Sequence, residues 1–336
     1  MGDSGAFRPA LSVLTAHYIR RSKLLMVATM NNKKVRKPAC CIARSLFTLT
    51  GAALAAFLPA AQATEGGGSS YPMGAENYLT GAMPPPGFYG QIFAESYRAD
   101  RLLDNNGKKA VDDFHLSADV IAPRLIWVTN EKLLDGNLAF HLNVPLVDLK
   151  VNVNGQHQSK SGMGDIIFGP ALGYHYSPNF HAIYAVDFFA PTGEYDRGDL
   201  ANIGRNYWAI EPIAAFSYVD PAGLNADLKM MYDFNLRNRD THYRSGQEAH
   251  ADYSLGWGLG NGWVVGIGGY VYRQITDDRQ RGDTIESTRG RAFAIGPSIK
   301  YSSASGWFVT AKWQKESEVR NRPEGEAYWL KLTIPL

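Results

Sequence analysis

The sequence predicts an all-β fold: a transmembrane, antiparallel, up-and-down β-barrel of about twelve strands, preceded by a periplasmic or luminal N-terminal segment. Three observations favour it. Residues 30–63 have the pattern of an export signal. From residue 87 onward, apolar and polar residues alternate with a period of two over segments of roughly 10–13 residues, long enough to cross a membrane at a tilt. Short turns alternate with longer polar loops, as in outer-membrane barrels.

The export signal occupies residues 30–63. A basic stretch, Lys33–Arg44, is followed by the apolar run Leu46–Phe57 and then by Ala61-Gln62-Ala63. These are the charged, apolar and A-x-A regions of a cleaved signal peptide. The apolar run is shorter than the ~17–25 residues of a membrane-spanning helix. We therefore expect cleavage between Ala63 and Thr64 and export across the inner membrane.

Residues 1–29 would make the charged region of this signal unusually long. We interpret them as a misassigned start or a disordered extension, and leave the true start open among Met1, Met26 and Met30. The only two cysteines of the chain, Cys40 and Cys41, precede the cleavage site. The mature chain would then contain no cysteine, which suits an oxidising compartment.

The charge of the chain is divided unevenly. Residues 1–63 hold nine of the 34 basic and one of the 32 acidic residues, so residues 64–336 hold 25 basic and 31 acidic residues. A mature chain with a net negative charge is not expected to bind nucleic acid.

Residues 64–86, TEGGGSSYPMGAENYLTGAMPPP, are rich in Gly, Ser and Pro and show no helical period. This composition predicts an irregular segment. Because it precedes the first strand, we expect it to begin on the periplasmic side, and we hypothesise that it folds into the lumen as a hatch. The alternative is a disordered chain terminus. Residues 87–336 are predicted to form the barrel.

The clearest strand is Leu224–Leu236. Leu224, Leu228 and their alternate neighbours form an apolar face, whereas Asp227 and Lys229 lie on a polar face. A strand separates the two sets, whereas a helix would mix them. In a soluble β-sandwich, the alternative fold, the apolar face would point inward; in a membrane barrel it faces lipid. The expected strands are 88–99, 113–127, 137–149, 164–176, 180–191, 206–218, 224–236, 248–260, 263–276, 289–302, 307–318 and 327–335.

The polar faces of these strands supply the side chains expected to line the lumen. The main candidates are His181, Asp187, Glu211, Asp227, Lys229, Asp233, Glu248, His250, Asp252 and Lys312, and His115 and Asp119 are expected there too. Acids outnumber bases, which favours a mildly cation-selective lumen; the alternative is that these charges only pair with one another. A twelve-stranded barrel is narrower than a porin of about 16 strands, so we expect a narrow, partly obstructed pore.

No catalytic residue, cofactor or metal site is predicted. Ser245, His242 and His250 share one segment and leave open an outer-membrane lipid hydrolase, but no acid that would orient the histidine can be assigned. His141 lies, like His115 and His181, on a strand of its own, and imidazoles so dispersed are more typical of hydrogen bonding than of metal binding. A structural barrel without a transport role is the remaining alternative.

Five segments in order resemble the meta-pathway of phenol degradation family. They are TEGGGSSYPMGAENYLTGAMPPPG (Thr64–Gly87), SGMGDIIFGP (Ser161–Pro170), FFAPTGEYD (Phe188–Asp196), IGRNYWAIEP (Ile203–Pro212) and YDFNLRNRDTHYRSGQEAH (Tyr232–His250). The resemblance implies a Gram-negative outer-membrane channel that takes up small hydrophobic or aromatic compounds, such as phenol-type substrates or long-chain lipids, by passive diffusion. One branch of the family is linked to sphingosine uptake. The resemblance implies no catalytic residue.

The expected partners are outer-membrane lipid, lipopolysaccharide and a small hydrophobic substrate. Arginines in two predicted external loops could meet lipopolysaccharide phosphates, although solvated loop charge is the simpler interpretation. These are Arg237, Arg239, Arg244, Arg279 and Arg281. The identity of the substrate and the oligomeric state are left open.

Overall fold

The predicted barrel is confirmed by a computed structural model that describes residues 67–336. The signal peptide, the cleavage site Ala63–Thr64 and residues 1–29 lie outside the described residues, so those expectations stay predictions. No helix in the described part of the chain is both long and apolar enough to cross a membrane.

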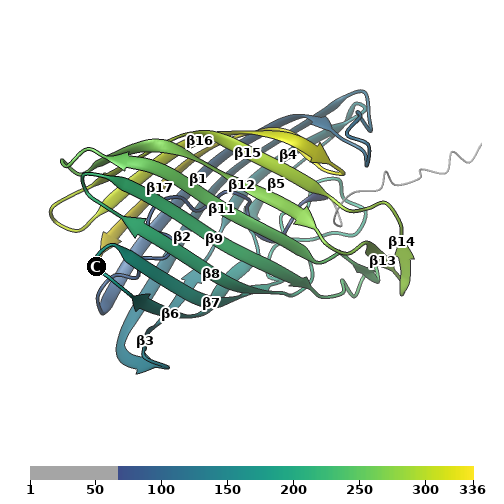
Figure 1. Ribbon diagram of the computed structural model, residues 1–336. Helices are drawn as coiled ribbons and strands as arrows, with labels where there is room; N and C mark the ends of the chain where they lie inside the picture. The colour runs from purple at the N-terminus through teal and green to yellow at the C-terminus, as the bar shows by residue number, and fades with distance from the viewer. Residues whose placement is uncertain (1–66) are drawn as a thin grey trace, which may run out of the picture. The chain divides into compact units, whose positions relative to one another are not determined.

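Twelve strands of the main antiparallel sheet close the barrel, because β1 pairs with β17 on one side and with β2 on the other (Figure 1). Neighbours in sequence are neighbours in the sheet, as an up-and-down barrel requires. The twelve are β1 (Gly87–Leu102), β2 (Phe114–Leu133), β3 (Gly136–Asn143), β6 (Ile166–His175), β7 (Phe180–Ala190), β8 (Ala209–Val219), β9 (Leu224–Asn235), β11 (Glu248–Gly258), β12 (Trp263–Gln274), β15 (Arg291–Ser302), β16 (Phe308–Arg320) and β17 (Pro323–Pro335).

The expected strand 137–149 is divided between β3 and a further strand, β4 (Leu146–Val153). β4 forms a hairpin with β5 (Gln156–Met163), which lies between the expected strands 137–149 and 164–176. β2 pairs with β3 and then with β4, so β4 continues the line of β3 after a break at Val144-Pro145. Proline lacks the N–H that the ladder would use at this break. β5 pairs only with β4, and its second edge has no strand partner among the described residues.

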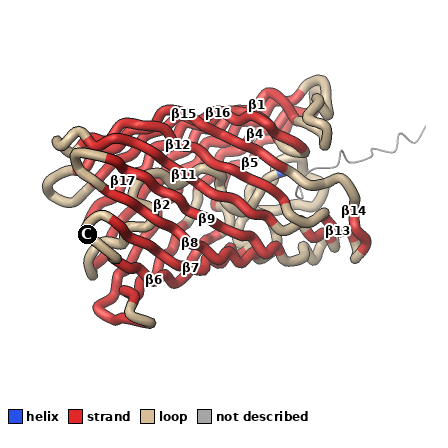
Figure 2. Tube along the Cα trace, in the orientation of Figure 1, coloured by secondary structure: helices blue, strands red, loops and turns tan. Residues whose placement is uncertain are grey.

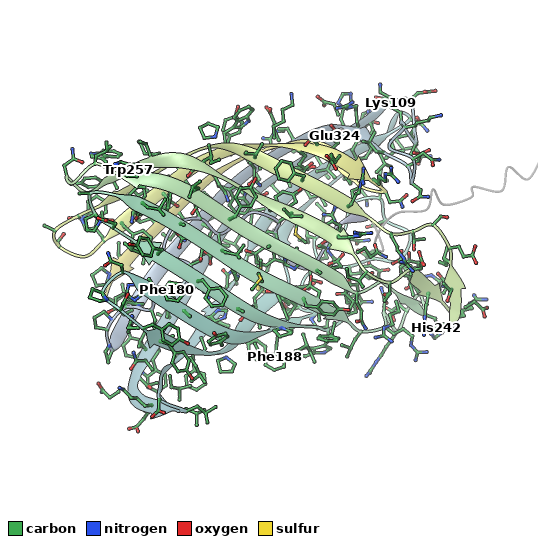
Figure 3. All side chains as sticks on the ribbon, viewed as in Figure 1. Lys109, Phe180, Phe188, His242, Trp257 and Glu324 are labelled. Atoms are coloured by element: carbon green, nitrogen blue, oxygen red, sulfur yellow. The ribbon has the colours of Figure 1, made fainter. Side chains whose placement is uncertain are left out.

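The two faces of the wall differ as a membrane barrel requires. On β9, Leu228 is 39% exposed on the outside, whereas its neighbours Asp227 and Lys229 are 5% and 7% exposed inside. Figure 3 shows Trp257 and Phe180 on the same outer surface. Since the side-chain period of a strand is two, the sequence neighbours of each outward apolar residue point into the barrel.

His115 and Asp119 contradict the expectation that they line the lumen. Asp119 pairs with Arg98 on the outer surface, where both side chains are 46% exposed, and the His115 side chain is 63% exposed. The 20-residue strand β2 is longer than a membrane crossing of about 9–11 residues. Its loop-side part therefore carries polar residues outward, because it extends beyond the hydrocarbon region.

The long loops at one end of the barrel carry a small second sheet made of β10 (Tyr243–Arg244), β13 (Asp278–Gln280) and β14 (Asp283–Ile285) (Figure 2). Asp278, the first residue of β13, is buried and accepts hydrogen bonds from the Tyr243 hydroxyl and the Gly246 N–H. We call β10, β13 and β14 the loop sheet. We call this end of the barrel the loop end, and the opposite one the turn end.

Leu228→Arg tests the assignment of the outer face. A guanidinium placed near the middle of the lipid-facing wall should destabilise the barrel by about 2–4 kcal/mol, whereas Leu228→Phe should be nearly neutral. The free energy of unfolding in lipid vesicles measures both. A neutral Leu228→Arg variant would mean that this face does not meet hydrocarbon.

The loop sheet should respond to pH through Asp278. Burial raises the pKa of the Asp278 carboxyl to about 7, well above the value of about 4 in an unfolded chain. The folded loop sheet therefore holds a proton that the unfolded loops release between those two values. Its stability is greatest below pH ~4 and falls as the pH rises toward 7.

Hydrogen exchange of the loop amides, corrected for the intrinsic effect of pH, measures this dependence. Protection should be greater at pH 5 than at pH 8 in the wild type, and the difference should vanish in Asp278→Asn. The exposed Asp240 of the same loops provides the control, since Asp240→Asn should behave like the wild type. Equal pH dependence in both variants would exclude Asp278 as the origin.

Candidate functional site

Residues 67–86, which we call the plug, lie inside the barrel. Tyr78 is fully buried, and Tyr71 and Met83 are each 6% exposed. At the loop end, Ser69 donates to Glu248 at the start of β11. Toward the turn end, the Gly81 N–H donates to Ser217, near the end of β8. The plug thus lies in the lumen, as hypothesised, but it runs from the loop end to the turn end rather than staying at the periplasmic mouth.

Asp252 on β11 holds the middle of the plug. Its Oδ2 accepts hydrogen bonds from the Tyr71 hydroxyl at 2.7 Å and from the Glu76 N–H at 2.9 Å, and its Oδ1 accepts one from the Gly74 N–H at 2.9 Å. Gly74 has a φ of +80°, a conformation that residues with a Cβ rarely adopt. One inward carboxylate therefore fixes three donors of an otherwise irregular segment.

Asp252 is the first anchor of the plug, and Glu76 provides the second. Here the carboxylate belongs to the plug and the basic groups belong to the wall. The Glu76 carboxylate lies 2.7 Å from Lys331 Nζ and 3.3 Å from Arg124 Nη1, and the backbone carbonyl of Glu76 accepts from Lys312 Nζ at 2.7 Å. Three basic side chains of the wall thus converge on one residue of the plug. Glu76 and Lys331 are almost completely shielded from water, and Arg124 is largely so. The attraction between the carboxylate and the basic groups is therefore needed to offset the cost of their desolvation.

The third anchor lies nearer the turn end. Asp227 accepts from the Thr80 N–H at 3.1 Å and from the Ser217 hydroxyl. A Cβ added to Gly81 would lie 2.7 Å from the backbone of Phe216, so the plug backbone touches the wall here. Only glycine permits this approach without a shift of the chain.

The structure places most of the predicted lumen residues inside the barrel. Asp187, Glu211, Asp227, Lys229, Asp233, Glu248, His250, Asp252 and Lys312 are all buried. His181 is different: it is half-buried near the turn end, with its Nδ1 2.8 Å from that of His175. Four of these residues contact the plug through hydrogen bonds, namely Asp227, Glu248, Asp252 and Lys312. A contribution of any of them to ion selectivity stays a prediction.

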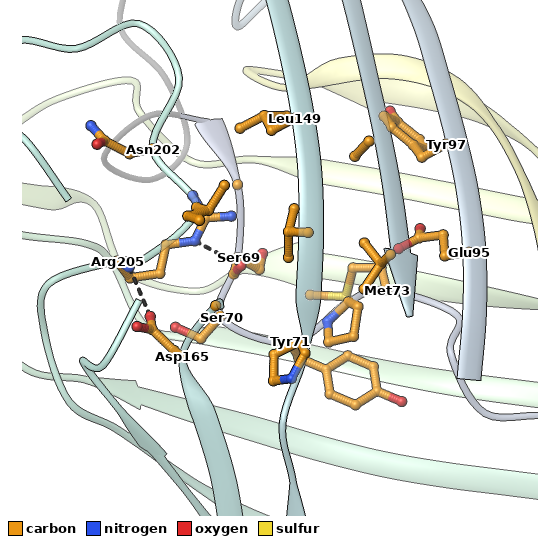
Figure 4. A pocket seen from close by; sticks show the side chains of 18 of the residues that line it. Ser69, Ser70, Tyr71, Met73, Glu95, Tyr97, Leu149, Asp165, Asn202 and Arg205 are labelled. Carbon is orange, nitrogen blue, oxygen red and sulfur yellow. Dashed lines mark hydrogen bonds between the residues drawn. The ribbon is translucent and has the colours of Figure 1, made fainter. Parts of the chain in front are cut away.

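A cavity of about 610 Å³ lies between the plug and one side of the wall (Figure 4). The plug lines it with Tyr71, Met73 and Glu76. Most of the wall side chains that face it are apolar and come from β1, β2, β4, β6 and β7. These are Phe93, Leu116, Ala118, Val120, Ala122, Val147, Leu149, Val151, Ile167 and Phe189.

The polar part of the cavity is a connected set of side chains. Arg124 Nε donates to His141 Nδ1 at 3.1 Å, and His141 Nε2 lies 2.8 Å from Asp187 Oδ1. Arg124 also reaches Glu76 of the plug. Glu95, Lys229 and Glu316 of the wall also line the cavity. The cavity therefore joins a broad apolar wall to several charged and hydrogen-bonding groups.

Sequence reasoning missed Arg124 and the apolar wall beside it. The lumen was expected to be polar throughout, but the inward face of β2 carries Leu116, Val120 and Ala122. Between Val120 and Val128 both faces of this strand are apolar apart from Arg124, and this was the available signal, since an ordinary barrel strand is apolar only toward lipid.

The outer end of the cavity is formed by the loop that follows β7. Residues Gly198–Arg205 contribute to its lining. The loop is held against the free edge of β5, where Gln158 Oε1 accepts from the Leu200 and Ala201 N–H groups at 2.6 and 2.9 Å. Lys160 Nζ lies 2.9 Å from both Asp196 and Asp199. Side-chain contacts, rather than a backbone ladder, thus close the wall here.

A protein-family model described as the MetA-pathway of phenol degradation matches residues 99–332. Among solved structures, the COG4313 outer membrane channel from Pseudomonas putida F1 is similar, with a TM-score of 0.66 and 21% identity over 77% of this chain and 98% of that chain. The translocator domain of autotransporter NalP from Neisseria meningitidis is more distant, with a TM-score of 0.45 and 9% identity over 76% and 91% of the two chains. No curated protein matches the chain.

Asp252→Asn should loosen the plug. The amide offers one acceptor oxygen in place of two, so buried donors of Tyr71, Gly74 or Glu76 lose their partner, at a cost of about 1–3 kcal/mol. The population with a displaced plug should rise by roughly 5–150-fold. We expect more frequent openings and a higher mean conductance in planar bilayers.

Asp119→Asn is the matched control, because Asp119 is an acid of the same barrel that lies on the outer surface. Its conductance should equal that of the wild type. If Asp252→Asn also leaves the conductance unchanged while the barrel folds normally, these hydrogen bonds do not hold the plug in the pore.

Proposed function

The chain belongs to the MetA-pathway of phenol degradation family, and from this premise we propose that it is an outer-membrane channel through which small hydrophobic or aromatic compounds diffuse passively. The observation that carries the proposal is the mostly apolar cavity between the plug and the wall. Its volume of about 610 Å³ falls within the ~300–1,000 Å³ of small-molecule sites.

The cavity favours apolar solutes for an elementary reason. Burial of apolar surface contributes about 25 cal/mol per Å², and the walls supplied by Phe93, Val120 and Phe189 offer such surface. A strongly hydrated solute would lose its water here without replacement hydrogen bonds along most of the wall. Arg124 and His141 can satisfy a single polar substituent, such as the hydroxyl of a phenol-type compound.

The plug fills one part of the lumen and leaves another part open. Its anchors on Asp252, Asp227 and Lys331 fill the part of the barrel where the wall is charged. The apolar side remains open as the cavity, and its outer end is covered by residues 198–205. We infer that movement of this loop admits the solute, while the docked plug acts as a hatch against water-soluble molecules.

The exposed arginines at the loop end support lipopolysaccharide as a partner. The register of the loop sheet places Arg244 opposite Arg279, and Arg237, Arg239 and Arg281 are exposed nearby in the same loops. Arginine forms bidentate, charge-assisted hydrogen bonds with phosphate. The two basic loops of the sequence are thus joined into one group, in which Arg237, Arg239, Arg279 and Arg281 are exposed and Arg244 is half-buried.

No specific observation favours the alternative that the protein is a lipid hydrolase. Ser245 is 1% exposed, and His250 Nε2 lies beside the carboxylates of Asp233 and Glu211. A structural barrel without transport would not require an apolar cavity beside the plug. Channel function is therefore the interpretation that the geometry supports best.

Ala122→Phe tests the proposal by narrowing the cavity from the wall of β2. Uptake of a radiolabelled monoaromatic hydrocarbon by whole cells should fall roughly tenfold, the factor that ~1.4 kcal/mol of lost binding produces. Ile121→Phe, one residue away on the lipid face and 56% exposed in the wild type, should leave uptake unchanged. Equal uptake by both variants, at equal levels of folded protein, would show that solutes do not pass through this cavity.

A further inference from the structure

Three buried side chains on neighbouring strands form a cluster apart from the plug anchors. Glu211 on β8, Asp233 on β9 and His250 on β11 each have a side chain that is 0% exposed. The ring of Tyr71, in the plug, lies over His250 with 4.9 Å between ring centroids. The cluster is therefore sealed between the wall and the plug.

The spacing of the three groups fits a tetrahedral metal site. His250 Nε2 lies 3.1 Å from Asp233 Oδ2 and 3.3 Å from Glu211 Oε2, and one ligand atom from each residue lies within 4.8 Å of the others. Zinc bonds to nitrogen and oxygen of about 2.0–2.1 Å imply a ligand–ligand separation of about 3.3 Å at the tetrahedral angle. Two of the three separations already match it.

The hydrogen bonds of the described residues leave this cluster incomplete. Glu211 Oε1 has no hydrogen-bond partner, and Glu211 Oε2 has only the 3.3 Å contact with His250 Nε2. Asp233 Oδ1 and His250 Nδ1 also lack a partner. Glu248, opposite Asp233 in the strand register, has a further buried oxygen without a partner. Buried polar atoms are normally paired, so buried carboxylate oxygens without a donor favour the binding of a cation.

In a second histidine–carboxylate pair of the same barrel, both imidazole nitrogens have a side-chain partner. His141 interacts through one nitrogen with Asp187 and through the other with Arg124. That pair needs no further ligand, because a guanidinium supplies the positive charge. The Glu211 cluster has two carboxylates around its imidazole and no guanidinium hydrogen-bonded to them among the described contacts.

We propose that Glu211, Asp233 and His250 bind one Zn²⁺ ion, with a water molecule or Glu248 as the fourth ligand. Two carboxylates balance the charge of the dication, and the neutral imidazole donates through Nε2. The imidazole and the small number of ligands favour zinc over Ca²⁺, which takes about 6–8 oxygen ligands. The ion would tie β8, β9 and β11 together directly beneath Tyr71 of the plug.

The test is zinc binding by the full chain. Because the cluster is sealed, the protein is refolded with ZnCl₂ and freed of loose metal by gel filtration, and bound zinc is then measured by elemental mass spectrometry. We expect one zinc per folded wild-type chain. Glu211→Gln and Asp233→Asn should each lower the affinity by roughly 10–100-fold or more. Asp187→Asn, from the complete pair, should still bind one zinc.

A folded wild type without zinc would overturn the proposal, and so would retention of zinc at wild-type affinity by both cluster variants. Equal loss of zinc in Asp187→Asn would do so as well, because the effect would not be local. X-ray absorption at the zinc edge of the wild-type protein keeps the test decisive if a variant fails to fold. It should show one nitrogen and two or three oxygens at about 2.0–2.2 Å, and no sulfur.

Discussion

The interior of this narrow barrel cannot leave charges unpartnered, and the rest of the structure depends on that constraint. A strand with lipid on one side must place its polar residues on the other, where a twelve-stranded wall leaves little room for water. Asp252, Lys312 and Lys331 face a lumen that does not hydrate them as bulk water would. The plug supplies their partners from its backbone amides, its carbonyls and Glu76.

The same constraint explains why the cavity lies on one side only. At Asp252, Asp227 and Lys331 of the wall, the plug docks and fills the lumen. Where β2 presents Val120 and Ala122 inward, the plug has no polar partner to contact, and space remains. Blockage of water-soluble molecules and accommodation of apolar ones thus arise from one distribution of side chains around the barrel.

Much of this could be predicted from the sequence, for a physical reason. The period of two fixes the face of every residue on a strand, so Leu228 outside and Asp227 inside followed from alternation alone. Alternation does not show where the membrane ends. It therefore does not show that Asp119 lies on the outer surface, and it does not predict the hairpin strand β5, which is polar on both faces. The path of the plug was also beyond prediction, because Gly74 and Asp252 are far apart in sequence and no periodicity links them.

The central claim is that buried hydrogen bonds, rather than confinement alone, hold the plug in the lumen. Hydrogen–deuterium exchange of the protein in lipid bilayers tests it most directly at the Gly74 and Glu76 amides, which donate to Asp252. The account predicts that these two amides are protected as strongly as those of β11. Exchange as fast as in the exposed loops, with the strands still protected, would contradict it.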